Sequence, residues 1–168
     1  MDIFLYYRGY GEWIEGKPLL IPKDAKLDRH VTKYPLEELV NNLSRLAVLS
    51  NIRTITLFLD ITYINPGKSV GSLWDFPKLP DKMCILSASS NGETSQIFAE
   101  KKHSFFTYAF LKVLAQGADD GDNVIDLGEI TEYIYKRVPE YVRSVSGSSR
   151  QNPKFNGMDL KRTVLDLR

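Results

Sequence analysis

The chain has 168 residues, of which 43% are hydrophobic and 26% are charged, and its formal net charge is +1. This balance is typical of one globular domain and argues against an intrinsically disordered chain. The near-neutral charge gives no electrostatic reason to expect nucleic acid or an anionic membrane as a partner. We therefore expect neither.

The single cysteine, Cys84, excludes an intrachain disulfide and a cysteine-rich metal site. No apolar run approaches the roughly 20 residues that a membrane-spanning helix needs, and the N-terminal residues do not resemble a secretion signal. We therefore expect a cytoplasmic protein that requires no cofactor.

Two short strands and a helix are predicted first. Ile3–Tyr7 is a continuous apolar run rich in aromatic residues, which predicts a strand covered on both faces. It leads into a glycine-flanked polar segment, Arg8–Glu12, which we interpret as a turn. Leu19–Ile21 is a short extended piece between prolines. From Pro35 onwards, apolar residues recur at helical spacing and predict an amphipathic helix.

Strands and helices alternate in the rest of the chain. The runs "RTITLFLD", which ends at Asp60, and "KMCILSASS" predict two more buried strands. The segment "HSFFTYAFLKVLAQG" predicts a helix with Gly117 as its cap residue, and a second helix begins at a capping box formed by Asp126 and Glu129. "RTVLDL" predicts a last short strand. This alternation indicates a three-layer α/β fold, with a mainly parallel sheet and helices on both faces.

Functional groups in such sheets gather beyond the carboxyl ends of the strands. Three segments are expected there, namely Arg8–Glu12, Asp60–Asn65 and Ser87–Asn91. Any chemistry should be sought among them.

In this order, the three segments resemble those of the caspase-like cysteine peptidases, especially the bacterial metacaspase-like branch, the orthocaspases. The family's histidine strand typically ends Tyr-Ser-Gly-His-Gly, and residues 7–11 here are "YRGYG". Its nucleophile strand ends Asp-Ala-Cys-Tyr-Ser-Gly, and residues 60–65 are "DITYIN". The next strand ends Ser-Ala-Ser, as residues 87–89 do. The resemblance implies one caspase-like (caspase–haemoglobinase) domain over residues 1–168.

Two positions depart from the family pattern, because its histidine falls on Tyr10 and its cysteine on Thr62. A phenol ordinarily keeps its proton up to a pH of about 10, so tyrosine is a poor base. A threonine hydroxyl is barely ionised near neutral pH and needs a base at hand. Losing both groups should abolish peptidase activity, because such groups act as a unit. The resemblance thus implies a catalytically inactive pseudopeptidase.

Some pocket residues are expected to remain. Gly11 resembles the glycine of the family's oxyanion hole, and Asp60 resembles the acid that helps to hold a basic substrate side chain. Asp60 could equally cap a turn, and Arg8 is a candidate ion-pair partner that would close the pocket. Ser87 and Ser89 complete the expected remnants.

The resemblance also places the start of the chain at the family's third strand, so the first two strands are expected to be absent. Ile3–Tyr7 would then be an apolar strand with an unpaired edge, and such edges promote association. We therefore expect a protein partner along Ile3–Tyr7, either another caspase-like chain or a separate N-terminal half of the same fold. The expected role is binding, scaffolding or regulation.

An alternative from another class is an active hydrolase with a relocated nucleophile. The candidates are Thr62, a serine of Ser87–Ser90, and Cys84. No base is visible beside them, and a cysteine inside an apolar strand is typically a small buried hydrophobe. A ligand-binding domain with a flavodoxin-like layer pattern is a third alternative, but no glycine-rich phosphate loop follows any strand.

Metal ligands are weakly indicated. Asp120, Asp122 and Glu129 suggest a calcium loop, but the match to an EF-hand fails at two other positions, so a capped acidic turn is the main interpretation. His30 and His103 have no metal-ligating partner at a convincing spacing. Two tryptophans in segments predicted as loops, Trp13 and Trp74, are candidate contact residues.

Overall fold

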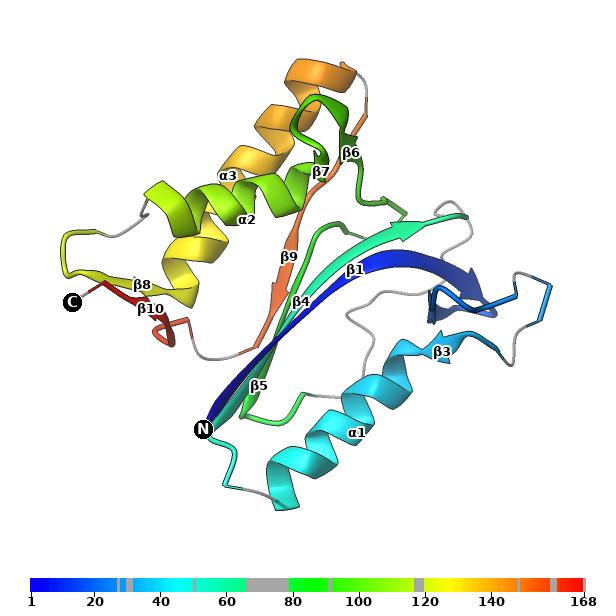
Figure 1. Ribbon diagram of the computed structural model, residues 1–168, viewed down its shortest axis with the longest axis horizontal. Coiled ribbons are helices and arrows are strands. Elements are labelled where there is room, and N and C mark those ends of the chain that lie inside the picture. Colours follow the sequence, from blue (N-terminus) through cyan, green and yellow to red (C-terminus); the bar gives the residue numbers. More distant parts are fainter. Residues whose placement is uncertain are drawn as a thin grey trace.

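The computed structural model describes the chain except for residues 27, 30, 31, 50, 66–78, 91, 117–119, 148, 158, 159 and 168. Its main sheet has the strand order β3-β2-β1-β4-β5-β9 (Figure 1). These strands are β1 (Asp2–Ile14), β2 (Lys17–Ile21), β3 (Tyr34–Pro35), β4 (Thr54–Tyr63), β5 (Met83–Ser87) and β9 (Lys154–Asn156). The α-helices are α1 (Leu36–Leu49), α2 (Phe105–Gln116) and α3 (Leu127–Ser146).

Two small sheets accompany the main one. They pair β6 (Ile97–Phe98) with β7 (His103–Ser104), and β8 (Val124–Asp126) with β10 (Thr163–Asp166). A short 3-10 helix, Ala99–Lys101, connects β6 to β7. The last strand of the chain was therefore predicted, but it pairs outside the main sheet.

The centre of the main sheet is parallel. β1 runs parallel to β4 from Asp2 opposite Thr54 to Gly11 opposite Tyr63, and β4 runs parallel to β5. The outer strands β2, β3 and β9 pair antiparallel. Helix α1 lies on one face, and α2 and α3 lie on the other (Figure 1). The predicted three-layer α/β architecture with helices on both faces is confirmed.

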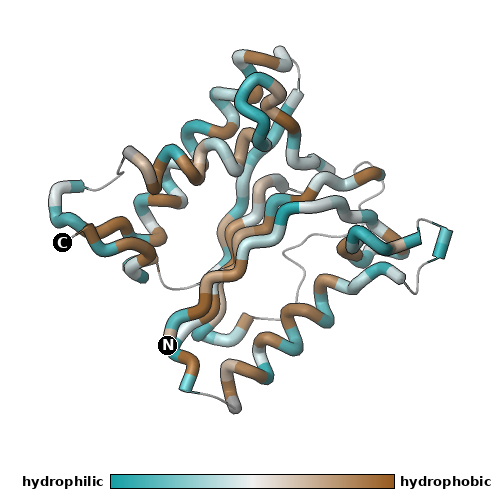
Figure 2. Tube along the Cα trace, in the orientation of Figure 1, coloured by the Kyte–Doolittle hydropathy of each residue, from teal (hydrophilic) through white to brown (hydrophobic). Residues whose placement is uncertain are grey.

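Alternate residues of the central strands supply two separate cores. On the α1 side, Ile55, Leu57 and Leu59 of β4 pack with Leu36 and Val40 of α1. On the other side, Phe58 of β4 and Cys84 and Leu86 of β5 belong to the core that includes helices α2 and α3. Figure 2 shows the same central strands hydrophobic near their beginnings and more polar towards their carboxyl ends. Burial on both faces explains why these strands have continuous apolar sequences.

Helix α3 begins as predicted. Glu129 N donates to Asp126 Oδ1 at 2.9 Å, and Asp126 N donates to Glu129 Oε2 at 2.8 Å, which completes the capping box. The cap predicted for α2, Gly117, lies outside the described residues. None of the helices in the described part of the chain is long and apolar enough to cross a membrane.

The predicted turn at Arg8–Glu12 is wrong, because β1 continues as a strand to Ile14. Near Tyr10 the strand gains β2 as an antiparallel partner while it still pairs with β4. Gly11 permits this close approach, since a Cβ atom there would lie 2.6 Å from Ile61 Cγ2. Trp13 belongs to the same strand and packs against Tyr63, with ring centroids 5.4 Å apart. Trp13 is therefore a core residue rather than a loop contact, and Trp74 lies outside the described residues.

Among the described strands, one pairs with the first part of β1. From Asp2 to Gly9 it pairs with β4, and its pairing with β2 begins only at Tyr10. Within the described residues, no strand pairs with the outer edge of Asp2–Gly9. The predicted unpaired edge at Ile3–Tyr7 is therefore present in the described part of the chain.

Candidate functional site

The β1–β4 register brings the expected site positions together. Tyr10 lies opposite Thr62, and Arg8 lies opposite Asp60, one alternation earlier on the same face of the sheet. Tyr10 is 56% exposed. The Thr62 hydroxyl is half-buried and donates to the carbonyl oxygen of Ser95 at 3.1 Å. Tyr10 and Thr62 are thus neighbours across the two strands, and each side chain carries a hydroxyl group.

Asp60 is fully buried and surrounded by hydroxyl donors. Its carboxylate accepts hydrogen bonds from Ser95 and Ser104, from Thr107 Oγ1 at 2.5 Å, and from Tyr6 OH at 3.2 Å. We call this group of five residues the Asp60 cluster. It draws its members from β1, β4, β7, α2 and the loop before β6. A buried carboxylate is tolerated because each oxygen receives at least one donor.

Arg8 lies at the outer side of the Asp60 cluster. Its Nη1 atom is 3.8 Å from Asp60 Oδ2, and 34% of the Arg8 side chain is exposed while Asp60 has none. The ion pair expected between these residues is therefore present. Together with the hydroxyl donors, Arg8 leaves the Asp60 carboxylate without solvent exposure.

The pKa of Tyr6 reflects its place in the Asp60 cluster, although Tyr6 is 41% exposed. Burial, followed by the nearby Asp60 carboxylate, raises the pKa of Tyr6 well above that of an ordinary phenol. The neutral hydroxyl is therefore kept as a donor and also contacts Thr107 Oγ1 at 2.5 Å. Burial raises the pKa of Tyr63 in the same direction, although Tyr63 belongs to the other core.

The expected oxyanion glycine, Gly11, lies between two strands. It is in register with Leu20 of β2 and with Tyr63 of β4, and its carbonyl accepts a hydrogen bond from Ile64 N at 2.9 Å. Both edges of its backbone therefore face a neighbouring strand. A groove of about 510 Å³ opens nearby, lined by Tyr7, Arg8, Gly9, Tyr10, Ile21, Pro22, Lys23 and Ala25.

The serine candidates follow β5. Ser87 and Ser89 are buried, and Ser87 Oγ donates to Ser89 O at 3.2 Å. Ser90 Oγ donates to Asn152 O at 2.9 Å. Cys84 is fully buried, and Gly157 lies so close that a Cβ atom there would be 2.6 Å from Cys84 Sγ. The serines thus bond to backbone carbonyls, Cys84 belongs to the core, and Asn91 lies outside the described residues.

His103 lies just before Ser104 in β7 and is half-buried. Successive side chains of a strand point to opposite faces, and Ser104 points towards Asp60, so His103 is directed away from the Asp60 cluster. The other histidine, His30, is outside the described residues.

The weak calcium candidates form a hydrogen-bonded turn. Glu129 accepts from Asp120 N at 2.8 Å as well as from Asp126 N, and Asp122 Oδ1 accepts from Val124 N at 2.8 Å. Backbone donors thus occupy the carboxylates of Asp122 and Glu129. Among the described residues, no group of three or more His, Cys, Asp or Glu side chains is arranged to hold a metal ion.

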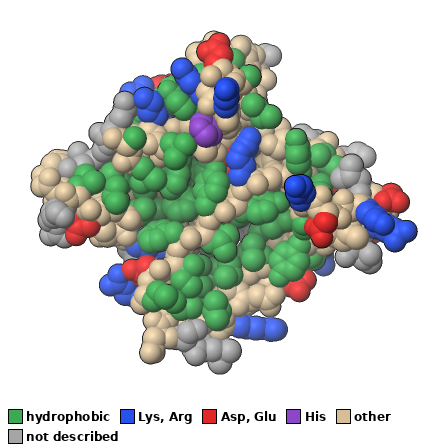
Figure 3. All heavy atoms as spheres, in the orientation of Figure 1, with side chains coloured by type: hydrophobic (Ala, Val, Ile, Leu, Met, Phe, Trp, Pro, Cys, Tyr) green, Lys and Arg blue, Asp and Glu red, His purple; other side chains and the backbone are tan. Residues whose placement is uncertain are grey.

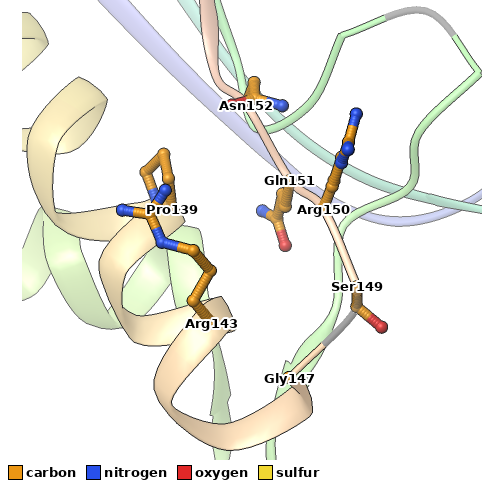
Figure 4. Close-up of a pocket in the computed structure, with 7 residues that line it drawn as sticks. All are labelled: Pro139, Arg143, Gly147, Ser149, Arg150, Gln151 and Asn152. Carbon is orange, nitrogen blue, oxygen red and sulfur yellow. The ribbon is translucent and has the colours of Figure 1, made fainter.

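A second pocket, near the carboxyl end of β5, was not predicted from the sequence. It has a volume of about 630 Å³ and lies beside the end of α3, lined by Pro139, Arg143, Gly147, Ser149, Arg150, Gln151 and Asn152. Figure 4 shows the Gln151 side chain between those of Arg143 and Arg150. Gln151 is buried; it donates to Ala88 O at 3.0 Å and accepts from Gln96 N at 2.9 Å. It therefore fixes the pocket wall to the segment after β5.

Comparison with known proteins identifies the fold. No family model matches the chain, and no curated protein matches it. Among solved structures, it is similar to the crystal structure of caspase-1 from Spodoptera frugiperda, with a TM-score of 0.62 over 96% of this chain. The chain has a caspase-like fold. Sequence identity is 17%, and the chain spans 61% of the length of that caspase-1 chain.

The caspase-like fold was predicted, but most of the Asp60 cluster was not. Tyr6, Ser95, Ser104 and Thr107 have no common motif in the sequence. One local signal was available, since Ser104 accepts a hydrogen bond from Thr107 N at 2.9 Å, as a helix-capping residue does. That pattern identifies a helix start, and it gives no information about the carboxylate beneath it.

Proposed function

We propose that this protein is a catalytically inactive caspase-like domain, a degenerate relative of the metacaspase-like branch, that acts by binding another protein. The observation that carries the proposal is the pairing of Tyr10 with Thr62 across β1 and β4. The sequence resemblance assigns the family's base and nucleophile to these two positions. Two hydroxyl groups cannot replace an imidazole and a thiolate, because neither provides a base near neutral pH.

The surroundings of these two residues support the proposal. The Thr62 hydroxyl donates to a backbone carbonyl, so its proton is not directed to a base. The Asp60 carboxylate is filled by hydroxyl donors and by Arg8. Cys84, the only thiol in the sequence, is buried in the core. These contacts also weaken the alternative of a relocated nucleophile.

The binding role is proposed from β1. Its edge at Asp2–Gly9 has unpaired backbone within the described residues, and its exposed residues include Phe4 and Tyr6. The partner that we propose is a protein strand, from another caspase-like chain or from an N-terminal half of the same fold. We keep the expectation of a cytoplasmic location, which rests on the single cysteine.

A peptidase assay tests the loss of catalysis. Wild-type protein and the Thr62→Ala variant are incubated with fluorogenic peptides ending in Arg, Lys or Asp, with and without calcium. An active caspase-like peptidase serves as the positive control. We expect both proteins to release no more fluorophore than buffer does. Wild-type turnover that Thr62→Ala removes, or that a thiol-reactive inhibitor blocks, would overturn the proposal.

A further inference from the structure

The open edge of β1 is unusually suited to another strand. Natural edge strands are commonly protected by lysine, proline or a bulge. The stretch Ile3–Tyr7 contains no such residue, and its pairing with β4 has no register shift. Figure 3 shows hydrophobic side chains gathered on one face of the molecule, and in the same orientation Figure 1 shows β1 crossing that face.

Both faces of β1 carry apolar side chains that remain partly exposed to solvent. Phe4 and Tyr6 point to the α2 face and are 42% and 41% exposed, although Phe4 stacks on Phe58 and Tyr6 on Phe110. Ile3, Leu5 and Tyr7 point to the α1 face and are half-buried against that core. A partner strand would therefore cover apolar surface on both faces at once.

The sequence of the open edge is self-complementary about Leu5. In an antiparallel pair with a twofold axis at Leu5, the Leu5 residues of two copies lie opposite each other. Phe4 then lies opposite Tyr6, Ile3 opposite Tyr7, and Asp2 opposite Arg8. Aromatic residues meet on the α2 face, apolar residues meet on the α1 face, and opposite charges meet at both ends.

This register also fits the length of the open edge. The open edge spans Asp2–Gly9, the proposed register pairs Asp2–Arg8 within it, and pairing with β2 begins at Tyr10. Directly opposed side chains in antiparallel strands have Cβ atoms about 4.5–5.5 Å apart, and such pairs are the unit of sheet stabilisation. The twofold axis keeps each residue on its own face, as an isologous dimer requires.

From this self-complementarity, we propose that two copies of the chain associate through antiparallel pairing of their β1 edges, centred on Leu5. The dimer joins the two main sheets into one continuous sheet. The inference rests on the proposed binding role of β1 and commits the partner to a second copy of this chain. It does not depend on the absence of peptidase activity.

The test measures mass and then register. Light scattering after size exclusion, over a wide range of protein concentration, should give a mass that rises from the 19.2-kDa monomer towards twice that value. Phe4→Lys places a charge in the aromatic pair and should raise the dimer dissociation constant about tenfold. Val145→Lys, at a 55% exposed position on α3, is the matched control and should leave the constant unchanged.

Disulfide trapping reports the register. Leu5→Cys places two thiols opposite each other, within the Cα separation that a disulfide spans. Under mild oxidation it should form a covalent dimer, whereas wild type, with only the buried Cys84, and Val145→Cys should not. Circular dichroism checks that each variant is folded. If Leu5→Cys does not fold, the mass of Phe4→Lys against Val145→Lys decides.

Three outcomes would overturn the dimer. The first is a monomeric mass at every concentration. The second is a dimer dissociation constant that is the same for Phe4→Lys and Val145→Lys. The third is a folded Leu5→Cys variant that forms no more covalent dimer than Val145→Cys. A monomeric protein without peptidase activity would contradict the proposed β1 dimer but agree with the proposed loss of catalysis. Peptidase turnover would remove the proposed inactivity, whatever the mass.

Discussion

Strands β1 and β4 are parallel neighbours with similar apolar sequences, yet their surroundings differ. β4 is buried from Ile55 to Ile61, between α1 on one face and α2 with α3 on the other. The paired part of β1 alternates between half-buried and exposed residues. A continuous apolar sequence therefore marks a strand with two apolar faces, but the position in the sheet decides how fully those faces are covered.

The largest difference is expected for two leucines that lie opposite each other, Leu57 of β4 and Leu5 of β1. Leu57 is completely buried, so Leu57→Ala should lower the free energy of unfolding by about 3 kcal/mol. Leu5→Ala should cost about 1 kcal/mol, because Leu5 is only half-buried. Urea denaturation at low protein concentration, where association is minimal, measures both. Equal losses would mean that β1 is covered as fully as β4.

The next difference concerns the ion pair between the strands. Asp60→Ala removes the acceptor of four buried or half-buried hydroxyl groups and should cost about 3 kcal/mol. Arg8→Ala should cost less than about 1 kcal/mol, because Arg8 is partly exposed and 3.8 Å from the carboxylate. Asp24→Asn, at an exposed position, is the control for a lost carboxylate. Thermal unfolding measures the loss of stability in both variants. If Arg8→Ala lost as much stability as Asp60→Ala, the ion pair rather than the hydroxyl groups would stabilise the carboxylate.

Two glycines of β1 separate its two halves. A Cβ atom at Gly11 would lie 2.6 Å from Ile61 Cγ2 and 3.1 Å from Leu19 O, so Gly11→Ala should cost about 2 kcal/mol. At Gly9 the nearest atom is the hydroxyl of Tyr7, at 2.6 Å, and this side chain can move. Gly9→Ala should therefore cost less than about 1 kcal/mol in the same urea experiment. The reverse order would contradict the close packing of β1 between β2 and β4.

The smallest effect is expected at the beginning of the two strands. Hydrogen bonds from Arg53 and Thr54 hold the pKa of Asp2 well below its ordinary value. A carboxyl with a lowered pKa stabilises the fold above its unfolded pKa, and this contribution is lost as the pH falls through the folded pKa. Asp2→Asn should therefore cost less than about 1 kcal/mol at neutral pH.

The difference between Asp2→Asn and wild type should narrow below a pH of about 4, the ordinary carboxyl range. Urea denaturation at a series of pH values measures it, with Asp24→Asn as the exposed control. A difference that is constant across the acidic range would mean that the Asp2 charge does not contribute.

The sequence by itself determined the order of elements and the class of fold. Apolar runs predicted the central strands, helical periodicity predicted the three main helices, and Asp126 with Glu129 predicted a capping box that is present. These features could be predicted because they depend on residues that are near one another in the chain. The resemblance to one family also singled out Tyr10 and Thr62, which the structure places opposite each other.

Only the tertiary structure decided how these elements combine. The expected turn after Tyr7 became a longer strand because Gly11 fits closely between β2 and β4. Asp60 became the centre of a closed cluster because hydroxyl groups 35 to 54 residues away in the chain converge on it. Hydrogen bonds between distant segments depend on which faces are brought together, and local sequence patterns do not specify that. For the same reason, the apolar sequence of β1 predicted an associating strand, whereas its exposed edge and self-complementary register depend on the pairing of the whole sheet.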